Sequence, residues 1–304
     1  MHLVLERDET AAGEARQRRS LMDVGYRMLG SVAEAEDVVQ ESYARWFALS
    51  DAQRDAIERP TAWLIRVASR ICLDILGSAR ARREQYVGEW IPEPLPEGAR
   101  WSSQGGTGAV DPAERVTIDE SVGMAMLVVL DTMTPAERVA FVLHDVFAFS
   151  FAEVGEMLDR SPAACRQLAS SARRRVREAD VEDAVQPGAG GVVAAFREAW
   201  ETGEMSSLLA VLDPDSTVVV DGGGKVAAAL HPVSGAEDVA AFFLGVRDRA
   251  PGLVFETRPV NGQPGLVVRD ARAVVTVLAF QVTRGRITRV WAVRNPDKLG
   301  AWAR

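Results

Sequence analysis

A run of arginines between residues 162 and 177, uninterrupted by any acidic residue, is the group in this chain best suited to bind an anion. Guanidinium groups bind phosphates and pair with guanine, and the amide of a glutamine pairs with adenine. Because the whole chain carries a formal net charge of -8, a basic stretch of this kind indicates a localised polyanion-binding surface. A solvated charged face on an ordinary helical hairpin is the alternative. The predicted contact residues are Arg166, Gln167, Ser170, Arg173 and Arg174.

Two short helices are needed to present these side chains. Ser150 and Glu153 have the spacing of a capping box, and apolar residues then recur on one helical face. Ser161 and Pro162 are the residue types preferred at the start of a second helix. Two helices joined by so tight a turn, the second of them basic, predict a helix-turn-helix within residues 134–178.

Residues suited to catalysis are few. The chain beyond residue 191 contains one histidine, His231, and no tyrosine. Its aspartates fall mainly at predicted strand ends and turns, where carboxylates commonly cap backbone N–H groups. The three glycines after Asp221 predict a turn, because the spacing of a phosphate-binding loop is absent. We therefore expect no enzymatic turnover and no catalytic residue, while a small ligand in this part of the chain stays open.

Length and composition bound the class of protein. A chain of 304 residues predicts two or three domains, and a hydrophobic content of 47% is ample for packed cores. The two cysteines, Cys72 and Cys165, are far apart in sequence and predict buried free thiols in a reducing compartment. No apolar run reaches the roughly 18 residues of a membrane span, and residues 1–16 lack a signal-peptide core. We expect a cytoplasmic protein that contacts no membrane and binds no metal or cofactor.

Three further helices are predicted in the N-terminal part. Residues 14–29 have a helical apolar pattern. Ser31 and Glu34 form a capping box that opens a second helix with an acidic outer side. Its apolar residues, with Phe47 as the last of them, are expected on or near one inner face. A third helix begins near Pro60 and has a basic outer side and a basic tail.

Two segments rich in proline and glycine divide the rest of the chain. The first, residues 87–116, contains the stiff, polyproline-like stretch WIPEP at residues 90–94. The second spans residues 180–191, and beyond it helices followed by an antiparallel meander indicate an α+β domain. Helices are predicted within residues 192–212 and 235–249, and strands at residues 216–225, 253–260, 265–270, 273–284 and 286–295.

Two blocks of sequence resemble a known family. LGSVAEAEDVVQESYARWF followed by PTAWLIRVASRICLDIL is similar to domain 2 of a bacterial extracytoplasmic-function (ECF) sigma factor, and residues 134–178 are similar to domain 4. The last part of the chain resembles the SnoaL-like, cone-shaped fold, and the motifs WIPEP, DGGGK and NPDKL resemble those of the sigma factors that carry this domain. The resemblance implies two all-α domains plus an α+β domain, with sigma domain 2 at 11–88, a linker at 89–113, sigma domain 4 at 114–180 and the SnoaL-like domain at 191–304.

The resemblance also implies a function and its residues. An alternative sigma factor binds RNA polymerase core and directs initiation at promoters with −10 and −35 elements, and here the C-terminal domain would regulate it. The motif that matches the core-binding helix contains Asp37, Val38, Gln40 and Glu41. The arginines of the third helix would contact DNA near the −10 element, and residues 166–174 would read the −35 element. The predicted contacts near the −10 element are Arg66, Arg70, Arg80, Arg82 and Arg83.

Two other functions fit parts of the sequence. One is a SnoaL-like enzyme or ligand sensor fused to a DNA-binding module, and the other is a dimeric repressor that uses the helix-turn-helix. A repressor has no need of the separate acidic and basic helices within residues 16–83, so the sequence favours the sigma factor.

The three shared motifs predict how the C-terminal domain acts. We expect it to pack on the linker, with the DGGGK turn on WIPEP, Glu93 paired with Lys225, and NPDKL over the same region. The alternative is an independent tethered domain, which the glycines at 188–191 would permit. The predicted interdomain residues are Trp90, Ile91, Pro92, Glu93 and Pro94, then Asp221, Gly222, Gly223, Gly224 and Lys225, then Asn295, Pro296, Asp297, Lys298 and Leu299.

Overall fold

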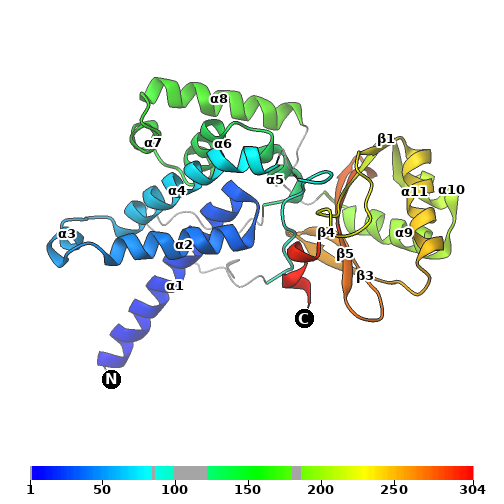
Figure 1. The fold of residues 1–304 in the computed structure, drawn as a ribbon, viewed down its shortest axis with the longest axis horizontal. Helices are drawn as coiled ribbons and strands as arrows, with labels where there is room; N and C mark the ends of the chain where they lie inside the picture. Colours follow the sequence, from blue (N-terminus) through cyan, green and yellow to red (C-terminus); the bar gives the residue numbers. More distant parts are fainter. Residues whose placement is uncertain (1, 84–85, 99–121, 180–185, 304) are drawn as a thin grey trace. The chain divides into compact units, whose positions relative to one another are not determined.

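The computed structural model describes residues 2–83, 86–98, 122–179 and 186–303, which group into two compact units (Figure 1). The described residues of the first, the helical unit, lie within Met1–Arg80 and Val129–Asp180. Those of the second, the sheet unit, lie within Ala81–Ala99, Ser121–Val128 and Val181–Arg304. Across these residues no helix has both the length and the apolarity that crossing a bilayer requires.

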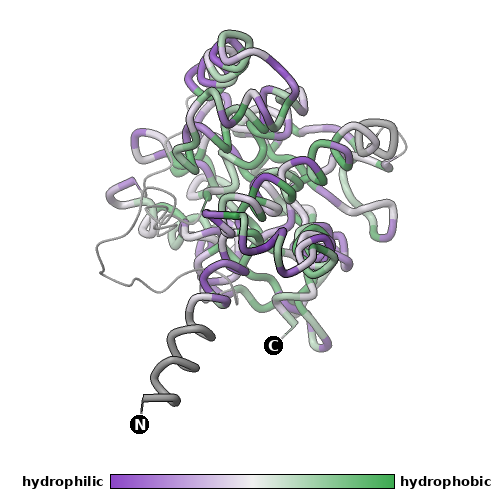
Figure 2. Tube along the Cα trace, turned by 90° about the vertical axis from the view of Figure 1, so that its left-hand side faces the viewer, coloured by the Kyte–Doolittle hydropathy of each residue, from purple (hydrophilic) through white to green (hydrophobic). Residues whose placement is uncertain are grey.

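The helical unit begins with the three helices expected from the sequence and one short addition. The first helix starts at His2 instead of near residue 14. The addition, α3, forms because Ser50 and Gln53 cap each other's backbone N–H groups. Hydrophilic and hydrophobic residues alternate along the helices (Figure 2), as expected of helices with one buried side. These elements are α1 (His2–Leu29), α2 (Val32–Phe47), α3 (Asp51–Asp55) and α4 (Pro60–Arg83).

A second group of helices follows residue 122. Arg138 ties it to the first group, because its Nη1 donates to the carbonyl oxygen of Met28 at 2.6 Å and its Nη2 pairs with Asp131 at 2.9 Å. Burial lowers the pKa of Arg138 to about 10. The elements are α5 (Met124–Asp131), α6 (Pro135–Phe141), the π-helical turn η1 (Val142–Val146), α7 (Phe151–Leu158) and α8 (Pro162–Glu178).

Helices α7 and α8 form the predicted helix-turn-helix. The Ser150–Glu153 capping box starts α7, and the Ser161 hydroxyl accepts from the Ala164 N–H at the start of α8. Asp159 adopts a left-handed conformation at the turn, with φ 52°. The turn returns so close to α7 that a Cβ on Gly155 would lie 2.6 Å from the carbonyl oxygen of Arg160. Glycine at this position therefore permits the tight angle between the two helices.

The sheet unit has the α+β architecture expected from the sequence. The strands follow the order β2-β1-β6-β5-β4-β3; β1 pairs with β6 in parallel, and the other neighbours are antiparallel. The two-residue β2 was not predicted. The elements are α9 (Ala189–Thr202), α10 (Met205–Val211), β1 (Leu212–Asp221), β2 (Val233–Ser234), α11 (Ala236–Arg249), β3 (Val254–Val260), β4 (Gln263–Arg269), β5 (Val274–Thr283), β6 (Arg286–Val293), η2 (Pro296–Lys298) and η3 (Gly300–Trp302).

Both faces of this sheet are apolar and covered. Because side chains alternate along a strand, Leu266 and Val268 pack with residues of helices α9, α10 and α11, whereas Val267 between them packs on the other face. The three helices lie beside the sheet in Figure 1. The second face is covered by Ile91, by Met124 at the start of α5, and by the C-terminal segment. Residues on either side of 99–121 are thus part of the core of the sheet unit.

The position of Gly155 can be tested by comparison with a glycine that has open space around it. Gly155→Ala should destabilise the helical unit by about 1–3 kcal/mol, because the new Cβ overlaps a backbone oxygen. Gly77→Ala on α4 meets nothing within 4 Å and should be neutral or stabilising by about 0.5–1 kcal/mol. Urea unfolding followed by circular dichroism measures both; equal midpoints for the two variants would contradict this packing.

Candidate functional site

Helix α8 gathers the predicted anion-binding residues on one face. Arg166, Gln167, Ser170 and Arg174 are exposed, and Arg173 is half-buried. Ser170 is three or four residues from each of the other four, and this spacing places all of them on the same side of the helix. Cys165, Ala169 and Ala172 are completely buried on the opposite side. The local sequence therefore produces a helix anchored by small residues, with its polar side chains directed outward.

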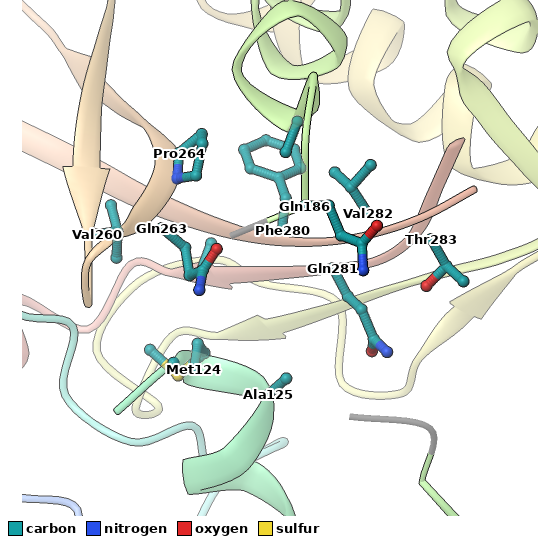
Figure 3. A pocket seen from close by; sticks show the side chains of 13 residues that line it. Met124, Ala125, Gln186, Val260, Gln263, Pro264, Phe280, Gln281, Val282 and Thr283 are labelled. Atoms are coloured by element: carbon teal, nitrogen blue, oxygen red, sulfur yellow. The ribbon is translucent and has the colours of Figure 1, made fainter. Parts of the chain in front are cut away.

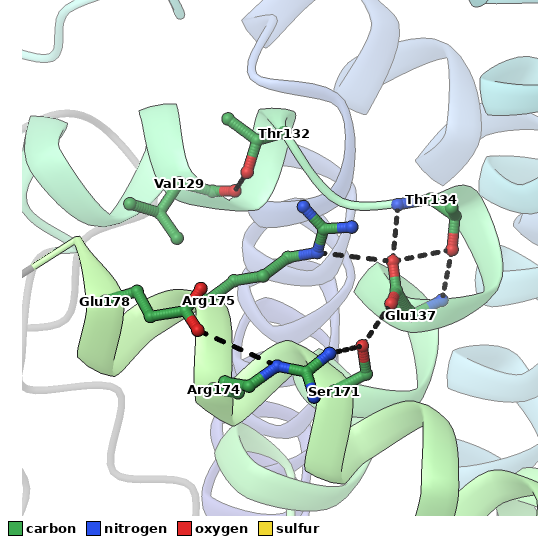
Figure 4. Close-up of polar contacts among 8 residues, drawn as sticks. All are labelled: Val129, Thr132, Thr134, Glu137, Ser171, Arg174, Arg175 and Glu178. Atoms are coloured by element: carbon green, nitrogen blue, oxygen red, sulfur yellow. Dashed lines mark hydrogen bonds and ion pairs between the residues drawn. The ribbon is translucent and has the colours of Figure 1, made fainter.

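The arginines of this helix differ in their partners. Arg173 Nε pairs with Asp145 Oδ1 at 2.6 Å, and Arg174 approaches Glu178 at 3.8 Å. Arg177, which is not in the predicted contact set, is exposed and falls on the same face as the predicted residues. Arg175 points to the other side and approaches Glu137 Oε2 at 3.7 Å (Figure 4).

Glu137 fastens α8 to α6. Its carboxylate accepts from the Ser171 hydroxyl at 2.6 Å and from the Thr134 N–H and hydroxyl at 2.9 Å each (Figure 4). Burial acts to raise the pKa of Glu137, but these hydrogen bonds and the charge of Arg175 outweigh it and lower the pKa. The ionised carboxylate thus fixes the orientation of the exposed face of α8.

Two of the predicted arginines on α4 contact the helix-turn-helix. Arg66 Nη2 pairs with Glu156 Oε2 at 2.8 Å, and Arg70 Nη2 donates to the Glu156 carbonyl oxygen at 2.9 Å. Arg59, just before α4, approaches Glu153 at 3.6 Å. The structure describes the backbone of Arg80, Arg82 and Arg83 as part of α4, but not their side chains.

Helix α2 presents a narrow exposed strip. Asp37, Gln40 and Glu41 are exposed, and the same face continues through Ala44 to Phe47, which is 70% exposed. Phe47 was expected to face inward with the other apolar residues of the helix. Its exposure at the C-terminal end of α2 adds an aromatic side chain to the acidic strip.

One predicted residue of this strip needs correction. Val38 is completely buried, so it belongs to the core under α2 and presents no surface to a partner. Glu41 is exposed, and its Oε1 pairs with Arg45 one turn later at 2.8 Å.

In the sheet unit, Asp221 is a fully buried carboxylate that joins all three sequence motifs. Its Oδ2 accepts from the Ile91 N–H at 3.0 Å and from Lys298 Nζ at 2.7 Å. Its Oδ1 accepts from the Tyr86 hydroxyl at 2.5 Å and from the Gly223 N–H at 3.0 Å. We call Asp221, Lys298, Tyr86 and Asn295, with their backbone partners, the Asp221 network.

Lys298 and Asn295 complete this network. Lys298 Nζ also donates to the Ile91 carbonyl oxygen at 2.5 Å and lies 4.2 Å from the centroid of the Trp90 ring. Asn295 Nδ2 donates to the Tyr86 hydroxyl at 2.9 Å. Burial, followed by the hydrogen bond to Asp221, raises the pKa of Tyr86. The tyrosine therefore stays a donor to the carboxylate at neutral pH.

The predicted pairing of Glu93 with Lys225 is wrong. Lys225 is exposed and pairs with Asp297, whereas Lys298 is the buried cation that reaches WIPEP. The turn does need its glycines, because Gly223 has φ +62° and a Cβ there would lie 2.3 Å from Asn295 Nδ2. The motifs meet as expected, but through a different lysine.

The remainder of the WIPEP segment is held by residues that the motifs did not include. Trp302 Nε1 donates to the Pro94 carbonyl oxygen at 2.9 Å. The Leu95 N–H donates to Asn261 Oδ1 at 3.0 Å, and the Asn261 N–H returns a bond to the Leu95 oxygen at 2.9 Å. An Asn-Gly pair between two predicted strands marks a turn in the sequence. The contact of this asparagine, Asn261, with the backbone of Leu95 is visible only in the structure.

Comparison with known proteins decides the family. Residues 15–83 match the family described as Sigma-70 region 2, and residues 123–176 match Sigma-70, region 4. The ECF RNA polymerase sigma factor SigJ of Mycobacterium tuberculosis is 40% identical over 294 residues, covering 93% of this chain and 90% of the relative. The chain belongs to the ECF sigma factors.

Two further relatives agree. SigI of Mycobacterium tuberculosis, described as a probable ECF RNA polymerase sigma factor, is 36% identical over 97% of this chain and 96% of its own length. The crystal structure of SigJ from the same organism has a TM-score of 0.74, at 34% identity over 96% of this chain and 98% of that chain. This protein is therefore an alternative sigma factor, with regions 2 and 4 in its helices and an α+β extension in its sheet unit.

Removing the Lys298 cation from the Asp221 network should show how much this charge contributes to the stability of the sheet unit. Lys298→Met leaves a buried carboxylate without its charged partner and should destabilise the sheet unit by about 3–5 kcal/mol. The matched control Lys225→Met breaks an exposed ion pair and should cost at most about 1 kcal/mol. Thermal unfolding of the two variants makes the comparison, and similar losses in both would contradict the role of Lys298.

Proposed function

We propose that this sigma factor binds RNA polymerase core through the exposed strip of α2, made of Asp37, Gln40, Glu41, Ala44 and Phe47. Acidic residues on the strip favour association with a basic partner and orient the encounter. The exposed aromatic ring of Phe47 beside them is of a type enriched at the core of protein interfaces. The buried Val38 supports the strip from below.

For promoter recognition, we infer that α8 enters the major groove at the −35 element. The observation that carries this inference is the one-sided arrangement of α8, with its polar face exposed and Cys165, Ala169 and Ala172 buried. Arg166 and Gln167 lie nearest the N-terminal end, where side chains of such a helix reach base edges. The face of α8 toward DNA consists of Arg166, Gln167, Ser170, Arg173, Arg174 and Arg177.

Near the −10 element, we propose phosphate contacts from Arg66 and Arg70, together with Arg80, Arg82 and Arg83. In the structure, Arg66 pairs with the Glu156 carboxylate and Arg70 donates to the Glu156 carbonyl oxygen. DNA phosphates and Glu156 therefore compete for the same guanidinium groups, and promoter binding through α4 requires the Glu156 contacts to open.

The C-terminal domain, we propose, regulates initiation by holding the chain that connects the two promoter-reading regions. Residues 86–96 and Met124 all pack on the sheet unit, so both ends of the connection are anchored there. A stiff segment with prolines loses little conformational entropy on such docking. We propose that the domain regulates without catalysing a reaction.

Charge reversal tests the polymerase interface. Asp37→Lys combined with Glu41→Lys should weaken binding to polymerase core at least tenfold, because both side chains face outward and would repel a basic partner. Glu198→Lys, on the exposed side of α9, is the matched control and should bind normally. Affinity measured with purified core decides; wild-type binding by the double variant would exclude this strip.

Substitutions on α8 separate phosphate contacts from base contacts. Arg174→Ala should weaken promoter binding similarly for all sequences and reduce its salt dependence by about one phosphate contact. Gln167→Ala should instead change the preferred −35 sequence. Binding to a randomised −35 library at two salt concentrations tests both, and an unchanged preference for Gln167→Ala would remove that residue from base recognition.

A further inference from the structure

The sheet unit contains a cavity of about 800 Å³ between α11 and the sheet. This volume is in the range that holds small-molecule ligands in proteins. A second hollow, between the start of α5 and strand β5, is about 30 Å³ and has room for roughly one water molecule (Figure 3). The apolar wall of the large cavity includes Val220, Phe242, Phe243, Val246, Val268 and Leu278.

The charged residues that line the large cavity are mostly cationic. They are Arg249, Arg272 and Arg294, against the single carboxylate of Asp270. Asp270 accepts from the N–H groups of Arg272 and Ala273 at 2.7 and 2.8 Å, and these bonds lower its pKa. The carboxylate of Asp270 is therefore bound by backbone N–H groups of its own turn. With three arginines and one aspartate, the net charge of the cavity lining is positive.

Two of these arginines are available to a ligand. Arg249 and Arg272 are exposed and have no ion-pair partner within 4 Å among the described residues, although the charge of Arg272 also acts on Asp270 in the same turn. Arg294 is half-buried, and its Nη1 donates to the carbonyl oxygen of Ala227, which lines the same cavity. Histidine, tyrosine and a second carboxylate are absent from the lining that the structure describes, so the cavity has the composition of a binding site without an acid–base pair.

We propose that this cavity binds an amphipathic anion, an apolar chain or ring system that carries a carboxylate. The apolar body lies against Phe242 and Val246, and the carboxylate pairs with Arg249 and Arg272. Guanidinium groups match a carboxylate in charge and geometry, and burial of the apolar body supplies most of the affinity.

The cavity wall is bonded directly to the Asp221 network. The backbone N–H groups of Arg294 and Asn295 donate to the Asp221 carbonyl oxygen at 2.7 and 2.9 Å. Val220, in the wall, directly precedes Asp221. The ligand then acts on initiation through Asp221, the residue that anchors WIPEP. This step alone rests on the regulatory role proposed above.

Decanoate and its neutral analogue decanamide test the ligand class on the full-length protein. Isothermal titration calorimetry should show decanoate binding at least tenfold more tightly than decanamide, a difference of about 1.4 kcal/mol. The double variant Arg249→Gln and Arg272→Gln should lose this preference. Arg289→Gln, an exposed arginine on β6 outside the cavity, is the matched control and should retain it.

Three results would overturn the proposal. They are equal affinities for decanoate and decanamide, an unchanged preference in the double variant, and no binding of decanoate by the folded protein at millimolar concentration. The assay contains neither polymerase nor promoter, so a failure here leaves the proposed sigma-factor function standing, and a failure in transcription leaves the ligand result standing.

Discussion

The buried carboxylate of Asp221 is the interaction on which the sheet unit depends. A fully buried charge costs several kcal/mol unless it is paired and hydrogen-bonded. Here the partners come from separate parts of the chain: Tyr86 and Ile91 from the segment 86–96, Gly223 from the adjacent turn, and Lys298 from the C-terminal segment. The native arrangement of any one segment therefore requires the others.

The same dependence appears in the packing of the sheet. Its second apolar face would be open to water without Ile91, Met124 and Trp302. Ile91 belongs to the connection between sigma regions 2 and 4, and Met124 lies at the start of region 4, so this connection is a structural component of the C-terminal domain. Regulation through such a component needs no separate docking surface, because any change in the sheet unit acts directly on the chain that joins the two DNA-reading regions.

Local sequence patterns predicted the helices and strands well. They predicted contacts between residues far apart in the sequence less well. Capping boxes and apolar periodicity located the helix-turn-helix, and alternation located the strands of the meander. The choice between Lys225 and Lys298 depends on which lysine faces the buried side of the terminal segment, which composition does not reveal. Phe47 was assigned inward because a helical pattern does not show where the core under a helix ends. Strand β2 was missed because two residues carry no periodicity.

Amide hydrogen exchange of the full-length protein tests the central claim, that the WIPEP segment is part of the sheet unit, most directly. The N–H groups of Ile91 and Leu95 donate to Asp221 and Asn261 in this account. They should exchange as slowly as the amides of the central strand β5. Exchange at the rate of an unstructured chain, with β5 still protected, would show a tethered linker and contradict the account.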